Sequence, residues 1–240
     1  MPTYTVSLKQ RQGVADGTVA FCFEKPASLS FKAGQYLNFT LLDPPETDAE
    51  DNTRTFSIAS APDEEELMVA TRMRDTAFKR VLRTMPLGFP VEIEGPFGNF
   101  TLHKDATRAA VFLTGGIGVT PFRSIIRDAG RKQLPHRLSL FYSNRRPEDA
   151  AFLEELQKAK SDNPNYQFIG TMTDMASSRR RWEGKIGYIN KQMLAESISD
   201  LTTPIYYIAG PRGMVTAMRK MLADTGIHDD GIRTEEFNGY

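Results

Sequence analysis

The sequence has few of the residues that build metal centres and disulfides. Cys22 is its only cysteine among 240 residues, which excludes an internal disulfide, a cysteine-ligated iron–sulfur cluster and a cysteine-rich zinc site within this chain. The chain has 3 histidines, and none of them forms an H-x-x-x-H pair. We therefore expect no metal site.

Net charge and long apolar runs are also lacking. The 30 Lys and Arg residues balance the 30 Asp and Glu residues, so no overall field attracts nucleic acid or an anionic membrane. No segment approaches the roughly 20 apolar residues of a membrane-spanning helix, and the start lacks a basic stretch followed by an apolar run. We expect a soluble, cytoplasmic protein without nucleic-acid or membrane partners. The sequence does not indicate its oligomeric state.

The first part of the chain is rich in short β-type runs separated by turn residues. The runs cover residues 4–8, 18–23, 36–41, 55–58, 67–71 and 91–94, and one helix is predicted near 76–84. This spacing predicts an antiparallel barrel or sandwich. The acidic, proline-bearing stretch 43–52 has no periodicity and is expected to form an exposed loop.

After residue 104 the pattern changes to alternating strands and helices. Apolar strands are predicted at 109–113, 138–142, 166–170, 205–209 and 232–237, with helices at 121–129, 148–160, 192–197 and 214–225. Such alternation is typical of a parallel sheet covered by helices on both faces. We predict two domains, residues 1–104 and 105–240.

The segment 111–121, VFLTGGIGVTP, runs from a buried strand through a glycine turn into a helix. Its spacing is G-x-G-x-x-P, one residue type away from the G-x-G-x-x-G dinucleotide fingerprint. Glycines let a backbone approach a phosphate, and helix N-terminal amides favour anions. A nucleotide-binding turn is favoured over a plain glycine-bearing turn, which stays the alternative.

A second strand end, in the segment 205–214 (IYYIAGPRGM), again enters a helix through Gly and Pro. Ligands of parallel sheets bind at the carboxyl ends of strands, so we expect this end to share an edge with the glycine turn. The alternative is a tight turn without a ligand.

Two segments of the barrel half carry cations and hydroxyls. Strand alternation puts Arg54 and Phe56 on one face of RTFS (54–57), and Thr55 and Ser57 on the other. An ordinary amphipathic edge strand would have the same pattern. The segment 71–79, TRMRDTAFK, is a possible diphosphate cradle at a helix start or, equally, a solvated basic face.

In this order the four segments resemble those of the ferredoxin–NADP⁺ reductase-like flavoenzymes, over nearly the whole chain. FKAGQY at 31–36, GPFG at 95–98 and WEG at 182–184 add to the resemblance. It implies a Greek-key β-barrel that binds FAD, formed by residues 1–104, and an α/β domain that binds NAD(P), formed by residues 105–240.

The resemblance also implies roles for individual residues. Phe56 would stack on the isoalloxazine ring, Ser57 would bind near flavin N5, and Arg54 would pair with the diphosphate. The expected flavin-binding residues are Arg54, Thr55, Phe56, Ser57, Thr71, Arg72, Met73, Thr76, Phe78, Lys79, Phe237 and Tyr240. The expected nucleotide-binding residues are Thr114, Gly115, Gly116, Gly118, Thr120, Pro121, Ser143, Arg145, Gly210, Pro211 and Met214.

The end of the chain, TEEFNGY at 234–240, resembles the terminus that covers one face of the flavin in this family. Phe237 or Tyr240 would then be a lid, the alternative being a frayed terminus. Ser57 and Glu236 are the predicted catalytic residues. Glu235 is a further candidate for modulating the flavin, although both glutamates could be surface charges.

Three positions depart from the family pattern. Thr76 and Lys79 stand where the family often has Gly and Ser, which replaces a close backbone approach and a hydroxyl by a cation. Ala209 stands where many relatives have the Cys of a C-G-P motif. Hydride transfer depends on proximity more than on a thiol, so we still expect it here.

The segment 141–146, FYSNRR, follows the second strand of the nucleotide domain. A hydroxyl and an arginine there favour NADP, with NAD possible. Arg179, Arg180 and Arg181 are expected to be a solvated basic loop or, less favoured, a docking patch for an acidic carrier.

These features predict an NAD(P)H oxidoreductase that passes hydride to FAD and electrons to a separate acceptor. The acceptor would be a ferredoxin- or flavodoxin-like carrier or a small-molecule oxidant. The alternatives are an electron-relay subunit of a larger complex, and an NADPH-dependent reductase of free flavin or ferric chelates. FMN in place of FAD stays open.

Overall fold

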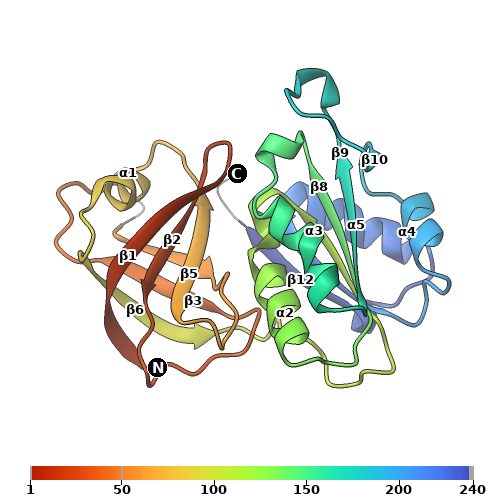
Figure 1. The fold of residues 1–240 in the computed structure, drawn as a ribbon, viewed down its shortest axis with the longest axis horizontal. Helices are drawn as coiled ribbons and strands as arrows, with labels where there is room; N and C mark the ends of the chain where they lie inside the picture. The colour runs from red at the N-terminus through yellow and green to blue at the C-terminus, as the bar shows by residue number, and fades with distance from the viewer. Residues whose placement is uncertain (1, 50, 238–240) are drawn as a thin grey trace.

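The computed structural model describes residues 2–49 and 51–237, arranged as two halves side by side (Figure 1). The first half is a six-stranded antiparallel sheet in the order β4-β3-β6-β1-β2-β5. Its elements are β1 (Thr3–Ala15), β2 (Thr18–Glu24), β3 (Tyr36–Leu41), β4 (Thr53–Ser57), β5 (Glu66–Arg72), α1 (Ala77–Thr84) and β6 (Pro90–Phe97).

This sheet curls into a barrel around an aromatic core. Beyond the end of β4, the amide of Ala59 donates to the carbonyl of Met68 in β5 at 2.8 Å, which joins the two ends of the sheet. Phe21, Phe23 and Phe39 alternate inward from β2 and β3 and are at most 1% exposed. The predicted antiparallel barrel is confirmed.

The second half is a six-stranded parallel sheet in the order β10-β9-β8-β7-β11-β12. Its strands are β7 (Ala110–Gly115), β8 (Leu138–Asn144), β9 (Tyr166–Met172), β10 (Lys185–Ile186), β11 (Ile205–Pro211) and β12 (Ile232–Phe237). Its α-helices are α2 (Thr120–Arg131), α3 (Leu153–Asp162), α4 (Lys191–Ser197) and α5 (Arg212–Ala223), and its 3₁₀ turns are η1 (Gly116–Val119), η2 (Pro147–Asp149), η3 (Met175–Ser177) and η4 (Asp229–Gly231).

Helices cover both faces of this sheet, as predicted. Phe112, on one face of β7, packs with α2 and α3, whereas Val111 and Leu113, on the other face, pack with α4 and α5. β7 lies between β8 and β11, so the chain reverses its direction of growth across the sheet there. Ligands of such sheets bind at this reversal, at the carboxyl ends of the two central strands.

The clearest differences from the prediction are the end of β1, the start of α3 and the short strand β10. β1 continues to Ala15, beyond the predicted 4–8, because it pairs with β2 along its second part. α3 begins at Leu153, not at 148, because Phe152 has a φ of 57°, which a helix cannot include. Glu148 instead lies in the η2 turn. The two-residue strand β10 was not predicted.

The two halves meet over a buried contact, and the predicted boundary near residue 104 falls in the segment between β6 and β7. Arg123 of α2 donates to the carbonyl of Ala59 at 2.6 Å and pairs with Glu64 at 3.0 Å, both in the barrel half. Ser124 donates to the carbonyl of Ser60 at 2.7 Å. This contact fixes the barrel against the parallel sheet.

Candidate functional site

A hollow of about 640 Å³ opens at the carboxyl ends of the central strands of the parallel sheet. Gly115 and Gly116 from the glycine turn and Pro211 and Met214 from the second strand end line it together. The two motifs therefore share one site, as their strand-end positions predict. Arg72, at the end of β5, lines the same hollow from the barrel half.

Gly118 has a packing role at this turn. A Cβ at this position would lie 2.5 Å from the carbonyl oxygen of Ala209 and 2.7 Å from the Cα of Gly210. Thr114 of β7 also contacts β11, because its hydroxyl donates to the carbonyl of Ala209 at 2.8 Å. The backbone of the turn is therefore held directly against the end of β11.

The predicted nucleotide residues fall into two groups. Those that line the hollow are Gly115, Gly116, Ser143, Arg145, Pro211 and Met214. Those that are buried and support the turn are Thr114, Gly118, Thr120, Pro121 and Gly210. The second group therefore shapes the turn from within the fold.

Part of the wall of the hollow was missed by sequence reasoning. Tyr188, 78% exposed, stands at the rim, and Met218 and Met221 of α5 add apolar surface. Asn144 and Thr173 add polar groups from the ends of β8 and β9. The i, i+4, i+7 spacing of the methionines from Met214 was the available signal, but helical spacing by itself favours core packing.

Arg145 lies at the rim beside an acidic partner. Its guanidinium pairs with the carboxylate of Asp174 at 3.0 Å, and the amide of Asp174 donates to the carbonyl of Arg145 at 2.8 Å. The hydrogen bond from Arg145 lowers the pKa of Asp174. A cation and an anion are thus both present where the adenosine ribose of a dinucleotide lies in such folds.

Ser57 and Glu235 meet between the two halves. The Ser57 hydroxyl donates to Oε1 of Glu235 at 3.5 Å, although the residues are 178 positions apart. Burial raises the pKa of Glu235 to about 7, and Oε2 of this carboxyl is buried without a hydrogen-bond partner among the described residues. A carboxyl that can gain or lose its proton near neutral pH therefore lies at the predicted flavin position.

Of the two neighbouring glutamates, Glu235 contacts Ser57, whereas the predicted catalytic residue Glu236 does not. Successive strand residues point to opposite faces, and in β12 it is Glu235 that faces the barrel. Glu236 is exposed, and its carboxylate lies 4.0 Å from Nε of Arg212. Phe237 ends β12 and packs half-buried against the core on the α2 and α3 side, while Tyr240 lies outside the described residues.

Arg54 and the first turn of α1 form an anion cradle in the barrel half. The Arg54 guanidinium lies over the ring of Phe78, 5.2 Å from its centroid. The carboxylate of Asp48 accepts from Arg54 at 3.2 Å and from the amide of Ala77, the first residue of α1, at 2.9 Å. The cradle thus already binds one anionic group, which is the chemistry that a diphosphate needs.

The other predicted flavin residues of the barrel half lie at the start of α1, on β4 and at the end of β5. Thr76 caps α1, since its hydroxyl accepts from the amide of Lys79 at 3.4 Å, and Nζ of Lys79 donates to the carbonyl of Arg72 at 2.8 Å.

The two predicted aromatic residues differ in exposure: Phe56 is partly exposed, whereas Phe78 is 2% exposed and belongs to the core. Thr55 donates to Asn38, Thr71 is buried, and the amide of Met73 donates to the carbonyl of Gly17.

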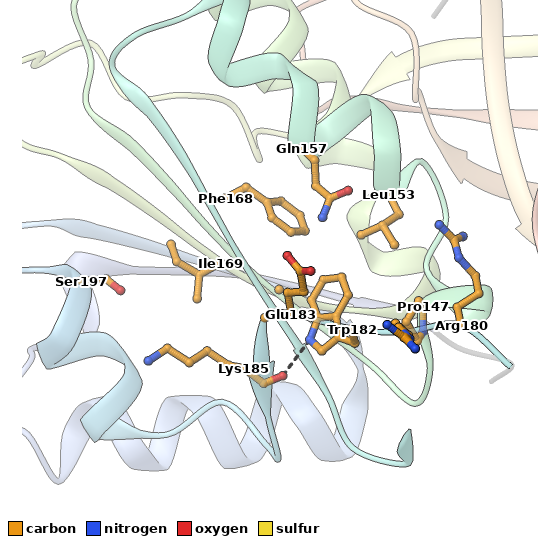
Figure 2. Close-up of a pocket in the computed structure, with 13 residues that line it drawn as sticks. Pro147, Leu153, Gln157, Phe168, Ile169, Arg180, Trp182, Glu183, Lys185 and Ser197 are labelled. Carbon is orange, nitrogen blue, oxygen red and sulfur yellow. Dashed lines mark hydrogen bonds between the residues drawn. The ribbon is translucent and has the colours of Figure 1, made fainter. Parts of the chain in front are cut away.

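A second hollow, of about 680 Å³, lies at the outer edge of the parallel sheet (Figure 2). Trp182 lies within it, with Phe168 and Leu153 on its walls, and its indole N–H donates to the carbonyl of Lys185 at 2.9 Å. This second hollow shares no lining residue with the first hollow, the nucleotide crevice at the strand ends. Its place away from the reversal point separates it from the candidate site.

A family model for the oxidoreductase NAD-binding domain matches residues 112–220, which include the glycine turn and the second strand end. Among solved structures, a cytochrome P450 reductase from Amycolatopsis aligns over 98% of this chain and 70% of its own, with a TM-score of 0.82 and 21% identity. A ferredoxin NADP⁺ reductase from Neisseria gonorrhoeae, with bound FAD and NADP, aligns over 98% and 99% with a TM-score of 0.78 and 20% identity. The chain therefore has the two-domain fold of the ferredoxin–NADP⁺ reductase-like flavoenzymes, and its residues 112–220 match the oxidoreductase NAD-binding domain.

The curated relatives that this chain matches are longer than it is. One subunit of the Na(+)-translocating NADH-quinone reductase of Pseudomonas aeruginosa is 33% identical over 156 residues, which are 63% of this chain and 38% of the relative. The chain spans half or less of the length of the curated relatives that it matches. The family-model match indicates an oxidoreductase NAD-binding domain in residues 112–220.

The residues of this chain fit FAD and a nicotinamide nucleotide. Arg54 and the α1 N-terminus already hold an anion, and the Ser57–Glu235 pair leaves a buried carboxylate oxygen unsatisfied beside the predicted ring position. The glycine turn gives the backbone access that a dinucleotide needs. Within the described ranges, no group of three or more His, Cys, Asp or Glu side chains could hold a metal ion.

Proposed function

We propose that this chain is an NAD(P)H oxidoreductase that passes reducing equivalents through FAD to a separate acceptor. One juxtaposition carries the proposal. Arg72 of the barrel lines the nucleotide crevice, and Glu235 of the parallel sheet reaches Ser57 of the barrel. The two predicted cofactor sites therefore adjoin, as transfer between two rings requires.

The chain's own residues position the groups and hold a proton. FAD, when bound, supplies the chemistry that accepts a hydride and releases electrons. Arg54 and the α1 N-terminus would hold its diphosphate, and Phe56 would contact its ring. Ser57 and Glu235 would hold a proton beside that ring, because burial brings the pKa of Glu235 to about 7.

We propose NADPH as the preferred donor and keep NADH as its alternative. Ser143 and Arg145 line the crevice and offer a hydroxyl and a guanidinium to a 2′-phosphate. Two observations favour NADH. Asp174 pairs with Arg145 and would repel a phosphate, and the matched relatives carry NADH in their names.

A second candidate function is an electron-relay subunit of a larger complex. The observation that favours it is that the matched relatives are named as subunits of a Na(+)-translocating quinone reductase. For the same reason the predicted absence of a membrane partner is not part of the proposal. Among the described residues, no helix has the length and apolarity needed to cross a membrane. A cytoplasmic location stays a prediction.

The decisive experiment is an anaerobic titration of the purified chain. The protein is purified without added flavin, its visible spectrum is recorded with and without added FAD, and flavin absorbance is followed during titration with NADPH and, separately, NADH. We expect a bound flavin that bleaches, with NADPH as the faster reductant. A chain that binds no FAD would overturn the proposal. A bound flavin that is reduced faster by NADH would overturn only the nucleotide preference.

Steady-state turnover then separates the two candidate functions. An independent reductase turns over artificial one-electron acceptors when isolated. A relay subunit would take up hydride in the titration but turn over those acceptors only when its partner is present.

A further inference from the structure

The loop between β3 and β4 places one of its acidic residues in the anion cradle. Asp48 bonds Nη2 of Arg54 through one carboxylate oxygen and the amide of Ala77 through the other, at 3.2 and 2.9 Å. Both side chains are mostly buried, with 18% of Arg54 and 30% of Asp48 exposed. The chain's own carboxylate therefore holds the two contacts that a flavin diphosphate would need.

We propose that Asp48 competes with the flavin diphosphate for this cradle, so that flavin is an exchangeable ligand of this protein. The inference rests on the proposed function and adds how tightly the flavin is held. A carboxylate and a phosphate bind a guanidinium and helix N-terminal amides through the same hydrogen bonds. Both anions cannot occupy one cradle, so flavin binding must displace the Asp48 side chain.

The loop is tethered in a way that allows this displacement. At its base the amide of Leu41 donates to the carbonyl of Asn52, and the Asn52 side chain donates to the carbonyl of Leu41, both at 2.9 Å. Further out, Glu46 pairs with Arg80 on the exposed surface of α1. The base is thus fixed to the sheet, while the Asp48 side chain is held in the cradle by an ion pair and an amide hydrogen bond that a diphosphate can replace.

Competition lowers the apparent affinity for flavin by the fraction of molecules in which the cradle is available. A partly buried, hydrogen-bonded ion pair of this kind favours the state with Asp48 in the cradle over the state with an open cradle by roughly 5- to 20-fold. A flavin held in this way exchanges with solvent, which favours transfer of reduced flavin as one route by which electrons leave the protein. Ligands without a phosphate do not compete with Asp48 for Arg54.

The test compares the dissociation constants of FAD and riboflavin for the full chain and two variants, from quenching of flavin fluorescence. Asp48→Asn keeps an oxygen that can accept from Ala77 but removes the charge that pairs with Arg54. Asp63→Asn is the matched control, because Asp63 carries one negative charge in an exposed ion pair with Arg131, at 2.9 Å. We expect Asp48→Asn to bind FAD about 5- to 20-fold more tightly, with riboflavin affinity and the control unchanged.

The other outcomes distinguish a failure of the competition by Asp48 from a failure of the proposed function. If FAD binds all three proteins equally, Asp48 does not compete, although the proposed function stands. If Asp48→Asn improves riboflavin binding as much as FAD binding, the loop only covers the ring site, and competition for the cradle is wrong. If no protein binds FAD and none is reduced by NADPH or NADH, the proposed function fails and the inference falls with it.

Discussion

Glu235 shows how one residue's environment sets its chemistry. Glu235 and Glu236 are the same residue type at neighbouring positions, yet only the carboxyl of Glu235 lies against Ser57. Burial raises the pKa of Glu235. Strand alternation requires that the two face opposite sides. Which of them faces the barrel depends on how β12 pairs with β11, where Ala209 lies opposite Glu235.

The first prediction concerns the pH dependence of stability. The pKa of Glu235 is about 7 in the fold against an ordinary value of 4.5, so its contribution to stability is full below about pH 4.5 and is lost as pH rises through 7. Glu235→Gln stays neutral and loses nothing. The difference in unfolding free energy between this variant and the parent should therefore increase, in favour of the variant, by about 2 to 3 kcal/mol from pH 5 to pH 8.

Urea unfolding of the flavin-free proteins at pH 5, 6, 7 and 8 measures this gap. Glu236→Gln is the control, because Glu236 is exposed. A gap that stays constant with pH, or one of equal size in the control, would show that Glu235 is not held as a neutral acid.

A second prediction at this scale concerns Arg145 and nucleotide choice. If its guanidinium binds the 2′-phosphate, Arg145→Ala removes a charge-assisted contact that NADH does not make. The KM for NADPH should rise about 10-fold while the KM for NADH changes less than about twofold, since one such hydrogen bond contributes roughly 1.5 kcal/mol. Asp174→Asn, which removes the competing anion, should shift the preference the other way. Equal changes for both nucleotides would place the 2′-phosphate elsewhere.

Among the elements, β7, its glycine turn and α2 show how sequence can specify a local structure. A fully buried strand, two glycines in a tight turn and Pro121 in the first turn of the helix each favour the observed conformation. α3 shows the opposite case. Its charged and apolar residues continue the helical pattern back to residue 148, but packing places Phe152 in a left-handed conformation and moves the start to Leu153.

Gly118 gives the prediction for this element. Gly118→Ala would put a methyl group within 2.5 Å of backbone oxygen on β11, so one strand end must move. We expect a loss of about 2 kcal/mol or more in unfolding free energy, as for other overpacked sites, together with weaker nucleotide binding. Gly213→Ala is the control, because a Cβ there meets nothing within 4 Å and Ala is the better helix former. Thermal unfolding of both variants checks this, and an unchanged Gly118→Ala would show that the turn adapts freely.

At the scale of the whole molecule, the position of the barrel against the parallel sheet decides whether the two cofactor sites adjoin. Arg123, 4% exposed, binds Glu64 of the barrel at 3.0 Å and Glu155 of α3 at 2.8 Å. Phe100, in the connecting segment, packs on Phe122 and Tyr207, with ring centroids 5.6 and 5.5 Å away. The core is therefore continuous across the junction.

Removing Arg123 should loosen this junction. Arg123→Ala leaves Glu64 and Glu155 without their buried partner, and we expect a loss of about 3 to 5 kcal/mol in unfolding free energy. Arg131→Ala is the matched control. Its pair with Asp63 also crosses the junction, but both side chains are over 40% exposed, so it should cost less than about 1 kcal/mol. Urea unfolding of both variants measures the difference, and equal losses would show that the buried network does not hold the halves together.

Much of this protein follows from its sequence by itself. Alternation and apolar runs specify a barrel followed by a parallel sheet, because the periods of 2 and 3.6 residues reflect which face is buried. Gly115, Gly116, Pro211 and Met214 could be placed together because parallel strands end at one edge of a sheet.

Only the tertiary structure decided the contacts between distant segments. It brought Glu235 to Ser57 across 178 positions, Asp48 into the cradle of Arg54, and Tyr188 to the rim of the crevice. Local sequence cannot specify such pairs, because strand pairing and domain packing set them. The same packing withdraws Glu235 from water, and this burial raises its pKa.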